Sequence, residues 1–270
     1  MHITIDREQF RDALEHIARI STKHITLPVL QCVLIEVTKN TTTLKGTNLE
    51  IGIEIEIPTK VTEEGVVAVS ATTLLQTITL LTEKEVDLSL TEGVLSVVTN
   101  KSKTNINTTT VEEFPTIPKV TKNPHTINKS LFALGIKTAA FAASQSSIKP
   151  ELGSVYIFKK KEHTLTFVST DSFRLVEKNV PQQNLVLTET IIIPKKNSLE
   201  LAHVCETLEC YPVLYVDENH CAIYYKNLYI NSRITSGTFT DYELIITKEY
   251  ETHTTLLTKD LQNTLKKTNI

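Results

Sequence analysis

Three side chains of metal-ligating type lie near one another in the second half of the chain: His203, Cys205 and Cys210. Structural zinc sites use four imidazole or thiolate ligands at short, fixed spacings such as C-x-x-C. Neither the number nor the spacing of these three side chains fits such a module. We therefore expect no metal and no cofactor, and we expect the four cysteines of the chain to be reduced thiols.

Asp171 and Arg174 are the other pair that could be imagined in catalysis. No histidine or nucleophile recurs beside them in the sequence, whereas a turn cap or a structural ion pair is typical of such a pair at the end of a strand. The chain also lacks the glycine-rich loops that bind nucleotide phosphates. The sequence indicates no reaction, and we predict that the protein is not an enzyme.

The segments around these residues occur twice. The run that begins at Pro28 leads through a polar turn into T-N-L-E-I at 47–51, and the run that begins at Pro150 leads into T-D-S-F-R-L at 170–175. The two prolines are about 122 residues apart, a period too long for a solenoid unit. Each copy is therefore expected to be a domain with its own core.

Each copy opens with a short strand and an amphipathic helix. In the first copy Phe10, Leu14 and Ile17 recur at helical spacing, and Leu131, Phe132 and Ile136 do so in the second. Second helices are predicted at 71–82 and 196–208. The predicted strands are 3–5, 33–37, 43–49, 51–57, 86–90, 94–99 and 104–109 in the first copy, and 126–127, 155–158, 165–170, 174–179, 213–216, 222–225 and 228–233 in the second.

Two joints separate the copies. The first lies near 117–124, where two prolines interrupt strand pairing, and the second lies near 246–252. After the second joint, T-T-L-L-T-K-D-L at 254–261 resembles the opening strand and helical turn of the earlier copies. We expect domains at 1–120 and 121–249, with 250–270 as the start of an incomplete third.

Composition and charge restrict the class of protein. The formal net charge is −3 and the pI is about 6.3, which disfavours binding to nucleic acid through bulk positive charge. The first residues are charged too early for a secretion signal, and no apolar run approaches the roughly 18 residues of a membrane span. The expected protein is soluble and cytoplasmic, with no membrane partner.

An ordered set of motifs resembles the bacterial DNA polymerase III β subunit family, the processivity sliding clamps. The motifs are T-L-P-V-L at 26–30, G-T-N-L-E-I at 46–51, T-D-S-F-R-L at 170–175, I-I-P-K-K at 192–196 and F-T-D-Y at 239–242. The resemblance implies the α+β DNA-clamp fold, with repeated domains that each pack two helices on antiparallel sheets. It also implies a homodimeric ring of three domains per chain that encloses duplex DNA and tethers the replicative polymerase.

The resemblance implies a DNA-binding set as well. A ring stays on DNA without tight binding, because escape requires an interface to open, so weak phosphate contacts from basic residues gathered on the inner helices suffice. Thr72 and Thr73 stand where relatives usually carry basic residues. Taken singly, each lysine of the set could equally be a solvated surface residue. The matching positions are Lys23, His24, Gln145, Lys149, Lys195 and Lys196.

A second implied site is a pocket for a short hydrophobic peptide motif of polymerases, the clamp loader and repair factors. Apolar walls and one guanidinium suit an extended peptide with buried anchors. Phe173 replaces a frequent histidine and Thr240 a frequent proline, which affects the choice of peptide. Leu152 and Leu175 could each be ordinary core residues. The matching positions are Leu152, Thr170, Ser172, Phe173, Arg174, Leu175, Thr240 and Ile245.

Two rival interpretations remain at this stage. A two-domain clamp could close as a trimer, although the helical segment after the second joint disfavours it. A Thr-rich β-repeat module for binding or adhesion, without a DNA function, is the alternative from another class, and the amphipathic helix that opens each copy disfavours it.

Overall fold

The structure is a computed structural model, which describes residues 1–21, 27–39, 41–146, 148–183, 187, 189–247 and 249–268. The chain divides into two compact units, Met1–Gly237 and Thr238–Ile270. The α-helices and strands of both sequence repeats lie in the larger unit, whereas the F-T-D-Y motif at 239–242 lies in the smaller one. The smaller unit contains the short 3₁₀ helix η2 (Tyr242–Leu244) and the exposed helix α5 (Thr258–Thr268).

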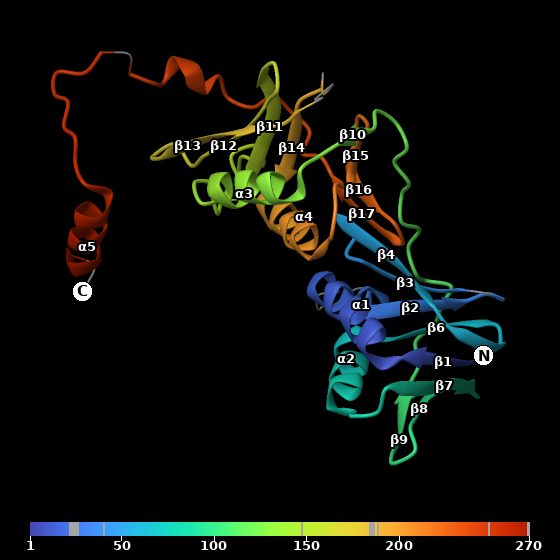
Figure 1. Ribbon diagram of the computed structural model, residues 1–270. Coiled ribbons are helices and arrows are strands. Elements are labelled where there is room, and N and C mark those ends of the chain that lie inside the picture. Colours follow the sequence, from blue (N-terminus) through green and yellow to red (C-terminus); the bar gives the residue numbers. More distant parts are fainter. Residues whose placement is uncertain are drawn as a thin grey trace. The chain divides into compact units, whose positions relative to one another are not determined.

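The first repeat contains two helices and nine strands among its described residues, and Figure 1 labels them in order along the chain. These elements are β1 (His2–Asp6), α1 (Arg7–Ile20), the 3₁₀ helix η1 (Pro28–Gln31), β2 (Cys32–Val37), β3 (Thr41–Thr47), β4 (Ile51–Pro58), β5 (Lys60–Glu63), β6 (Gly65–Ser70), α2 (Ala71–Leu80), β7 (Glu85–Thr91), β8 (Val94–Val98) and β9 (Lys103–Asn107).

Among its described residues, the second repeat follows the same order without counterparts of η1 and β5. Its elements are β10 (His125–Thr126), α3 (Lys129–Ala140), β11 (Ser154–Lys161), β12 (Thr164–Thr170), β13 (Leu175–Pro181), β14 (Ile191–Pro194), α4 (Lys195–Thr207), β15 (Val213–Val216), β16 (His220–Tyr225) and β17 (Leu228–Arg233). The α+β fold predicted from the sequence is confirmed: α1 packs beside α2, α3 packs beside α4, and both pairs cover antiparallel sheets.

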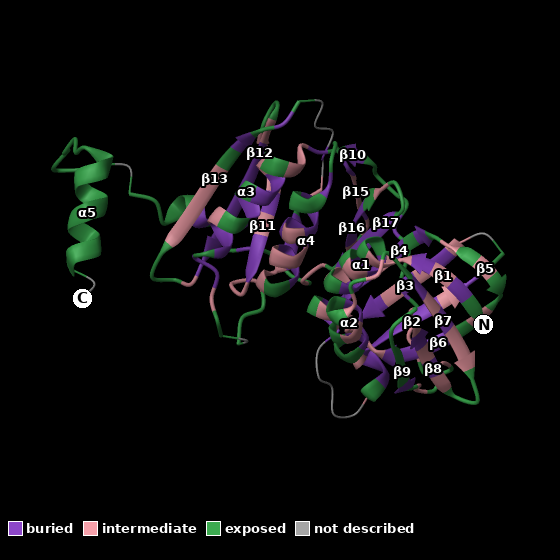
Figure 2. Cartoon of the chain, turned by 60° about the horizontal axis from the view of Figure 1, so that its bottom comes forward, coloured by how far each residue is buried: buried purple, intermediate pink, exposed green. Residues whose placement is uncertain are grey.

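The first helix of each repeat begins at a matching cap. The Asp6 carboxylate accepts hydrogen bonds of 3.0 Å from the backbone N–H groups of Glu8 and Gln9. The Asn128 side chain does the same for the second and third N–H groups of α3, at 3.1 Å. Such caps satisfy N–H groups that have no partner inside the helix. The buried faces of α1 and α3 then enter a core that runs through both repeats (Figure 2).

One antiparallel sheet joins the two repeats. Its strand order is β10-β15-β16-β17-β4-β3-β2-β6, so strands of the first and second repeats meet where β17 pairs with β4. In that ladder Ile230 lies opposite Ile53 and Leu228 lies opposite Ile55. The remaining strands form a five-stranded sheet, β5-β1-β7-β8-β9, and a four-stranded sheet, β13-β12-β11-β14. The repeats are thus joined edge to edge by main-chain hydrogen bonds.

The segment between the repeats crosses this joint, and we refer to residues 109–120 as the linker strap. At its start, Val111 and Phe114 pack against Cys32, Leu34 and Ala68 of the first repeat. At its end, the strap adds Ile117 and Val120 to a cluster with Ala222 and Tyr229 of the second repeat. The strap therefore bridges the apolar surfaces of the two domains.

Close approach of the strap requires a glycine on the sheet beneath it. A Cβ atom at Gly52 would lie 2.8 Å from Ile117 Cγ2 and 2.8 Å from Asn231 Oδ1. Neither atom is at the end of a long flexible side chain that could easily move away. The glycine of the strictly alternating run 51–57 is therefore a packing requirement at the joint.

Three strands were not predicted from the sequence, and most predicted strands differ from the observed ones at one or both ends. β5, β6 and β14 are short apolar or mixed runs, for which periodicity distinguishes strand from helix poorly. β3 ends at Thr47 rather than at residue 49, and β13 begins at Leu175, because the intervening residues form tight turns. None of the helices in the described ranges is both long and apolar enough to cross a membrane.

Candidate functional site

The hairpin turn between β12 and β13 carries most of the predicted peptide pocket. The Thr170 hydroxyl donates to the Arg174 carbonyl oxygen at 2.8 Å and accepts from the Ser172 N–H at 3.1 Å. The Asp171 carboxylate accepts from the N–H groups of Phe173 and Arg174, both at 3.0 Å. These two polar side chains replace the hydrogen bonds that a longer strand ladder would supply, so they fix the turn.

The first repeat contains the same turn with the same hydrogen bonds. The Thr47 hydroxyl donates to the Ile51 carbonyl oxygen at 2.9 Å, and Asn48 takes the place of Asp171 as acceptor for two N–H groups. The third residue of each turn is left-handed, with φ of 75° at Leu49 and 77° at Ser172. The repeated T-[N/D] motif is therefore a structural turn, and any function specific to the second repeat must come from the side chains that differ.

The surroundings of the two turns differ. In the first repeat, the Glu50 carbonyl oxygen accepts hydrogen bonds from Arg233 N–H at 2.8 Å and from the Asn197 amide at 3.2 Å, so the second repeat covers this turn. In the second repeat the equivalent residue is Phe173, whose side chain is 97% exposed. The second turn thus presents a surface that its counterpart uses for a domain contact.

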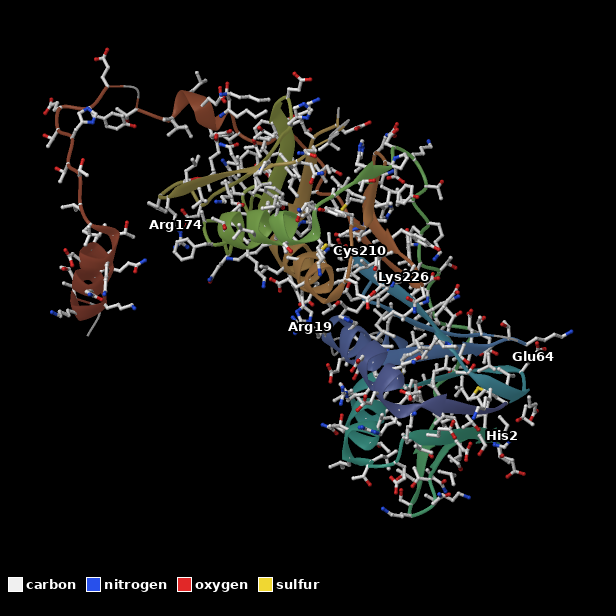
Figure 3. All side chains as sticks on the ribbon, viewed as in Figure 1. His2, Arg19, Glu64, Arg174, Cys210 and Lys226 are labelled. Atoms are coloured by element: carbon white, nitrogen blue, oxygen red, sulfur yellow. The ribbon has the colours of Figure 1, made fainter. Side chains whose placement is uncertain are left out.

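Arg174 is held in a defined position beside this surface, and Figure 3 shows it at the end of the hairpin near α3. Its Nε donates to Asp171 Oδ2 at 2.9 Å, and its guanidinium lies 4.5 Å from the centre of the Phe141 ring. The predicted ion pair between Asp171 and Arg174 is confirmed. Backbone N–H groups of Arg174 and Phe173 are the main cause that lowers the pKa of Asp171, so this carboxyl is held ionised.

Phe141 is a site residue that sequence reasoning missed. It lies directly after α3, far from Arg174 in the chain, and its side chain is 66% exposed. The signal that could have found it is an aromatic residue at a helix end where a small or polar one would normally meet water. Cation–π stacking on this ring orients the Arg174 side chain.

The other predicted pocket residues occupy three positions. Leu175 begins β13 opposite Thr170 and is half-buried. Leu152 is also half-buried and lies in the turn before β11, where its N–H donates to the Lys149 carbonyl oxygen at 3.0 Å. Thr240 and Ile245 lie in the smaller unit, where both are exposed. The structure therefore brings Thr170, Ser172, Phe173, Arg174 and Leu175 together in one turn.

Three of the predicted DNA-binding residues line one cavity at the start of α4. Gln145, Lys195 and Lys196 contribute to a cavity of about 590 Å³ between the loop after α3 and the first turn of α4. Lys195 Nζ lies 3.4 Å from the Ala143 carbonyl oxygen, whereas Lys196 is exposed. Lys149 is exposed in the same loop but does not line the cavity. Lys23 and His24 lie outside the described residues.

The helices of the larger unit carry both signs of charge. α1 to α4 together carry seven basic and five acidic residues. Four of the basic side chains are paired with carboxylates. Arg7 and Arg11 pair within α1, and two others pair with α4: Arg19 with Glu200 at 2.8 Å, and Lys137 with Glu206 at 2.6 Å. The four helices carry a small excess of basic residues in a chain whose formal net charge is −3, and Lys195 and Lys196 at the start of α4 contribute to it.

The metal candidates have a structural explanation. Cys205 is buried in α4, and burial raises the pKa of its thiol to about 12, so it does not ionise near neutral pH. Cys210 is exposed beyond the helix, and all four cysteines are free. Within the described ranges, His, Cys, Asp and Glu form no group of three or more that could hold a metal ion.

Paired helices on antiparallel sheets, repeated and joined edge to edge, define the class of DNA-clamp folds. Two family models match this chain: the N-terminal domain of the DNA polymerase III beta subunit over residues 1–118, and its central domain over residues 126–241. The chain therefore belongs to the DNA polymerase III beta subunit family, the DNA sliding clamps of bacterial replication. Clamp domains in both repeats leave the adhesion module without support.

Curated relatives and solved structures agree. The chain is 26% identical to the beta sliding clamp of Halalkalibacterium halodurans, covering 99% of this chain and 73% of the relative. It is 28% identical to that of Buchnera aphidicola, covering 97% and 73%. Its fold matches the beta subunit of Streptococcus pyogenes with a TM-score of 0.89 at 23% identity, covering 99% and 73%. A Helicobacter pylori beta clamp bound to a DNA ligase peptide matches with a TM-score of 0.85 at 24% identity, covering 98% and 75%.

Proposed function

We propose that the chain is a subunit of a ring that encircles duplex DNA in the cytoplasm and tethers the replicative polymerase. Its contribution is topological: it performs no reaction, and it reads no base sequence. We assign residues 1–120 and 121–249 to two clamp domains and residues 250–270 to the beginning of a third. In this arrangement the domains form the wall of the ring, with the paired helices facing the DNA.

The observation that carries this proposal is the joint between β4 and β17. By the internal repeat, β13 is the counterpart of β4, and β9 is the counterpart of β17. Within the described part of Met1–Gly237, β13 and β9 each end a sheet with one edge unpaired. If the same pairing is repeated, β13 pairs with the counterpart of β17 in another domain, and β9 pairs with the counterpart of β4 in another domain. The domains then form a continuous row in which every contact runs head to tail. A fixed rotation per domain closes such head-to-tail contacts into a ring and removes the exposed edges.

Phosphate contacts in this ring are few and come mainly from the start of α4 and the loop beside it. Lys195 and Lys196 begin that helix, where unpaired N–H groups and the helix dipole also favour an anion. Gln145 and Lys149 lie in the neighbouring loop. We place Lys23 and His24 in the same set by resemblance to the family. Because four helices carry a nearly balanced charge, the DNA is held by enclosure more than by attraction.

Partner peptides dock at the turn between β12 and β13. Exposed Phe173, half-buried Leu175 and the fixed Arg174 guanidinium offer apolar contacts with one cation. An extended peptide with hydrophobic anchors suits such a surface. Leu152, half-buried in the turn before β11, extends the proposed pocket. The polymerase, the clamp loader and repair factors would compete for this pocket, because each binds through the same kind of short hydrophobic motif.

Retention on circular DNA tests the proposal. The protein is loaded onto a nicked plasmid by its clamp loader and separated from free protein by gel filtration in about 0.5 M salt, which weakens phosphate contacts strongly. We expect retention on the circle and release after one restriction cut. A protein held by contacts alone would be indifferent to the cut, and that result would overturn the ring.

A further inference from the structure

The two repeats also meet through a polar contact between α1 and α4, on the other side of the joint from the linker strap. Arg19 on α1 makes two hydrogen bonds with Glu200 on α4: Nε to Oε2 at 2.8 Å, and Nη2 to Oε1 at 3.1 Å. Figure 3 shows Arg19 between the two helices. The geometry is the paired, parallel arrangement that arginine prefers with carboxylates. This ion pair fixes one end of the contact.

Two histidines from different repeats face each other one turn away. The ring centres of His16 on α1 and His203 on α4 are 5.8 Å apart, with the rings tilted by 58°. Nε2 of His16 lies 3.5 Å from the Thr207 hydroxyl, and its Nδ1 is buried with no hydrogen-bond partner among the described residues. An imidazole without a partner for one nitrogen is poorly prepared to carry a second proton.

The surroundings of His16 favour a neutral ring. Burial is the main cause that lowers the pKa of His16, and the neighbouring His203 lowers it further. Asp12 and Glu200 act in the opposite direction, and Arg19 acts in the same direction as burial. The other charged or titratable groups near the pair are Glu206 on α4 with its partner Lys137 on α3, Glu209 with its partner Lys226, and Tyr225 of the β16–β17 hairpin.

Most of the nearby carboxylates are already engaged. Glu200 is bound to Arg19, Glu206 to Lys137, and Glu209 to Lys226 at 2.7 Å. Asp12 accepts a hydrogen bond of 2.7 Å from Arg11. A doubly protonated histidine pair would therefore find no free carboxylate among these groups to separate its two charges.

The contact has room to change. A cavity of about 430 Å³ lies beside His16, lined by α1, by Ile55 and Ile57 of β4, by the end of α4 and by the β16–β17 hairpin. The strands β4 and β17 and the linker strap contain no histidine. Acid can therefore act on the helix side of the joint while the ladder and the strap keep their bonds.

We propose that the His16–His203 pair makes the contact between α1 and α4 acid-sensitive. With neutral rings the two helices stay in contact. When both rings are protonated, two like charges face each other across the joint, and the helices separate about the β4–β17 ladder as water enters the neighbouring cavity. The pair is thus a pH-controlled hinge between the two domains.

Spin-label distances test this inference in the full chain. Cys210 is changed to serine, and labels are attached at Gln76→Cys on α2 and Ser130→Cys on α3, both exposed positions on the two sides of the joint. Distances are measured by pulsed electron paramagnetic resonance at about pH 8 and about pH 5, the second well below the ordinary histidine pKa because the pKa of His16 is lowered. Circular dichroism at both values verifies that the chain is folded.

We expect a longer or broader label distance at the lower pH, and loss of that change in the His16→Gln/His203→Gln variant. His2→Gln, an exposed histidine on β1, is the matched control and should keep the change. His203→Gln alone should also abolish it, which keeps the test available if the double variant does not fold. An unchanged distance, or the same change in the folded variants without the pair, would overturn the proposal. A nuclear magnetic resonance titration should also show that His203→Gln raises the pKa of His16.

Discussion

The Tyr229 hydroxyl donates a hydrogen bond of 2.7 Å to the Pro118 carbonyl oxygen, so a residue of the second repeat holds the strap that leaves the first. The same hydroxyl accepts a bond of 2.9 Å from the Val120 N–H. Asn231, two residues further along β17, donates to the Pro118 oxygen as well, at 3.0 Å. Burial raises the pKa of Tyr229 to about 12, so the hydroxyl keeps its proton at any physiological pH.

Tyr229→Phe should therefore destabilise the joint. The change removes one hydroxyl and leaves the Val120 N–H without its partner, a loss of about 1–2 kcal/mol in the free energy of unfolding. Urea denaturation measures it. Tyr224→Phe is the control, because Tyr224 lies beside Tyr229 on β16 but is about half exposed. Equal losses in both variants would show that the strap is not held by this hydroxyl.

A second stability prediction concerns Gly135 in the middle of α3. A Cβ atom there would overlap the Phe167 ring of β12, which is fully buried against Phe132. Gly135→Ala should cost about 1–3 kcal/mol because the packed ring must move, although alanine is the better helix former. Thermal unfolding measures the difference.

Gly153→Ala provides the comparison. A Cβ atom at Gly153 would meet nothing closer than the Pro150 carbonyl oxygen at 3.5 Å, which is ordinary contact. This variant should keep the unfolding temperature of the unchanged protein. Unaltered stability in Gly135→Ala would mean that α3 is not packed against β12 as closely as the structure has it.

The sequence predicted the fold well where local pattern decides it. Strict alternation at 51–57 marked β4, and the matching turns at 47–51 and 170–175 revealed the repeat. The pairing of β4 with β17 could not be predicted, because alternation specifies which face of a strand is buried and not which strand lies beside it. Contacts between distant segments, such as Arg174 on Phe141, depend on that same tertiary arrangement.

The charge of the helices shows the same limit. From the sequence alone, Arg19 and Lys137 are two cations that could contact DNA. In the structure they form ion pairs with Glu200 and Glu206. Sequence placed Lys195 and Lys196 near a helix start, and there the structure agrees. The sequence gives the charge of each side chain, but the carboxylate with which a basic side chain forms an ion pair depends on how the helices pack.

Burial of His125 should make the folded protein less stable in acid. Its side chain is 6% exposed, and neither ring nitrogen has a hydrogen-bond partner within the described ranges. Burial lowers the pKa of His125, with Glu189 acting in the opposite direction. The unfolded chain, with an ordinary pKa of about 6.5, then binds the proton at higher pH than the folded chain. Stability should therefore fall as the pH drops below about 6.5, until the folded state also takes up the proton.

Urea midpoints at a series of pH values check this prediction. His125→Gln cannot take up the proton and should flatten the dependence between about pH 7 and 5. His2→Gln removes an exposed histidine and should leave the dependence unchanged. The same slope in all three proteins would exclude His125 as a source of the acid sensitivity.

Removal of the two lysines at the start of α4 should change how DNA binding depends on salt concentration. If Lys195 and Lys196 contact phosphates, replacing both with alanine should weaken binding to duplex DNA and reduce the slope of log K against log salt by about 2. Fluorescence anisotropy with a short duplex at several salt concentrations measures both. Lys60→Ala, on β5 and paired with Glu85, should change neither. A weaker affinity with an unchanged slope would indicate that the two side chains do not neutralise phosphates.

The turn between β12 and β13 predicts which side chains bind partner peptides. Arg174→Ala with Leu175→Ala removes the fixed guanidinium and an adjacent apolar contact, while Thr170 and Asp171 still hold the backbone of the turn. A Q-L-x-L-F peptide should then bind more weakly by about 2 kcal/mol, or roughly thirtyfold in Kd. Isothermal titration calorimetry measures the change, and Lys178→Ala on the same strand is the control. Unchanged affinity in the double variant would mean that the peptide site lies elsewhere, even if the protein still forms a ring on DNA.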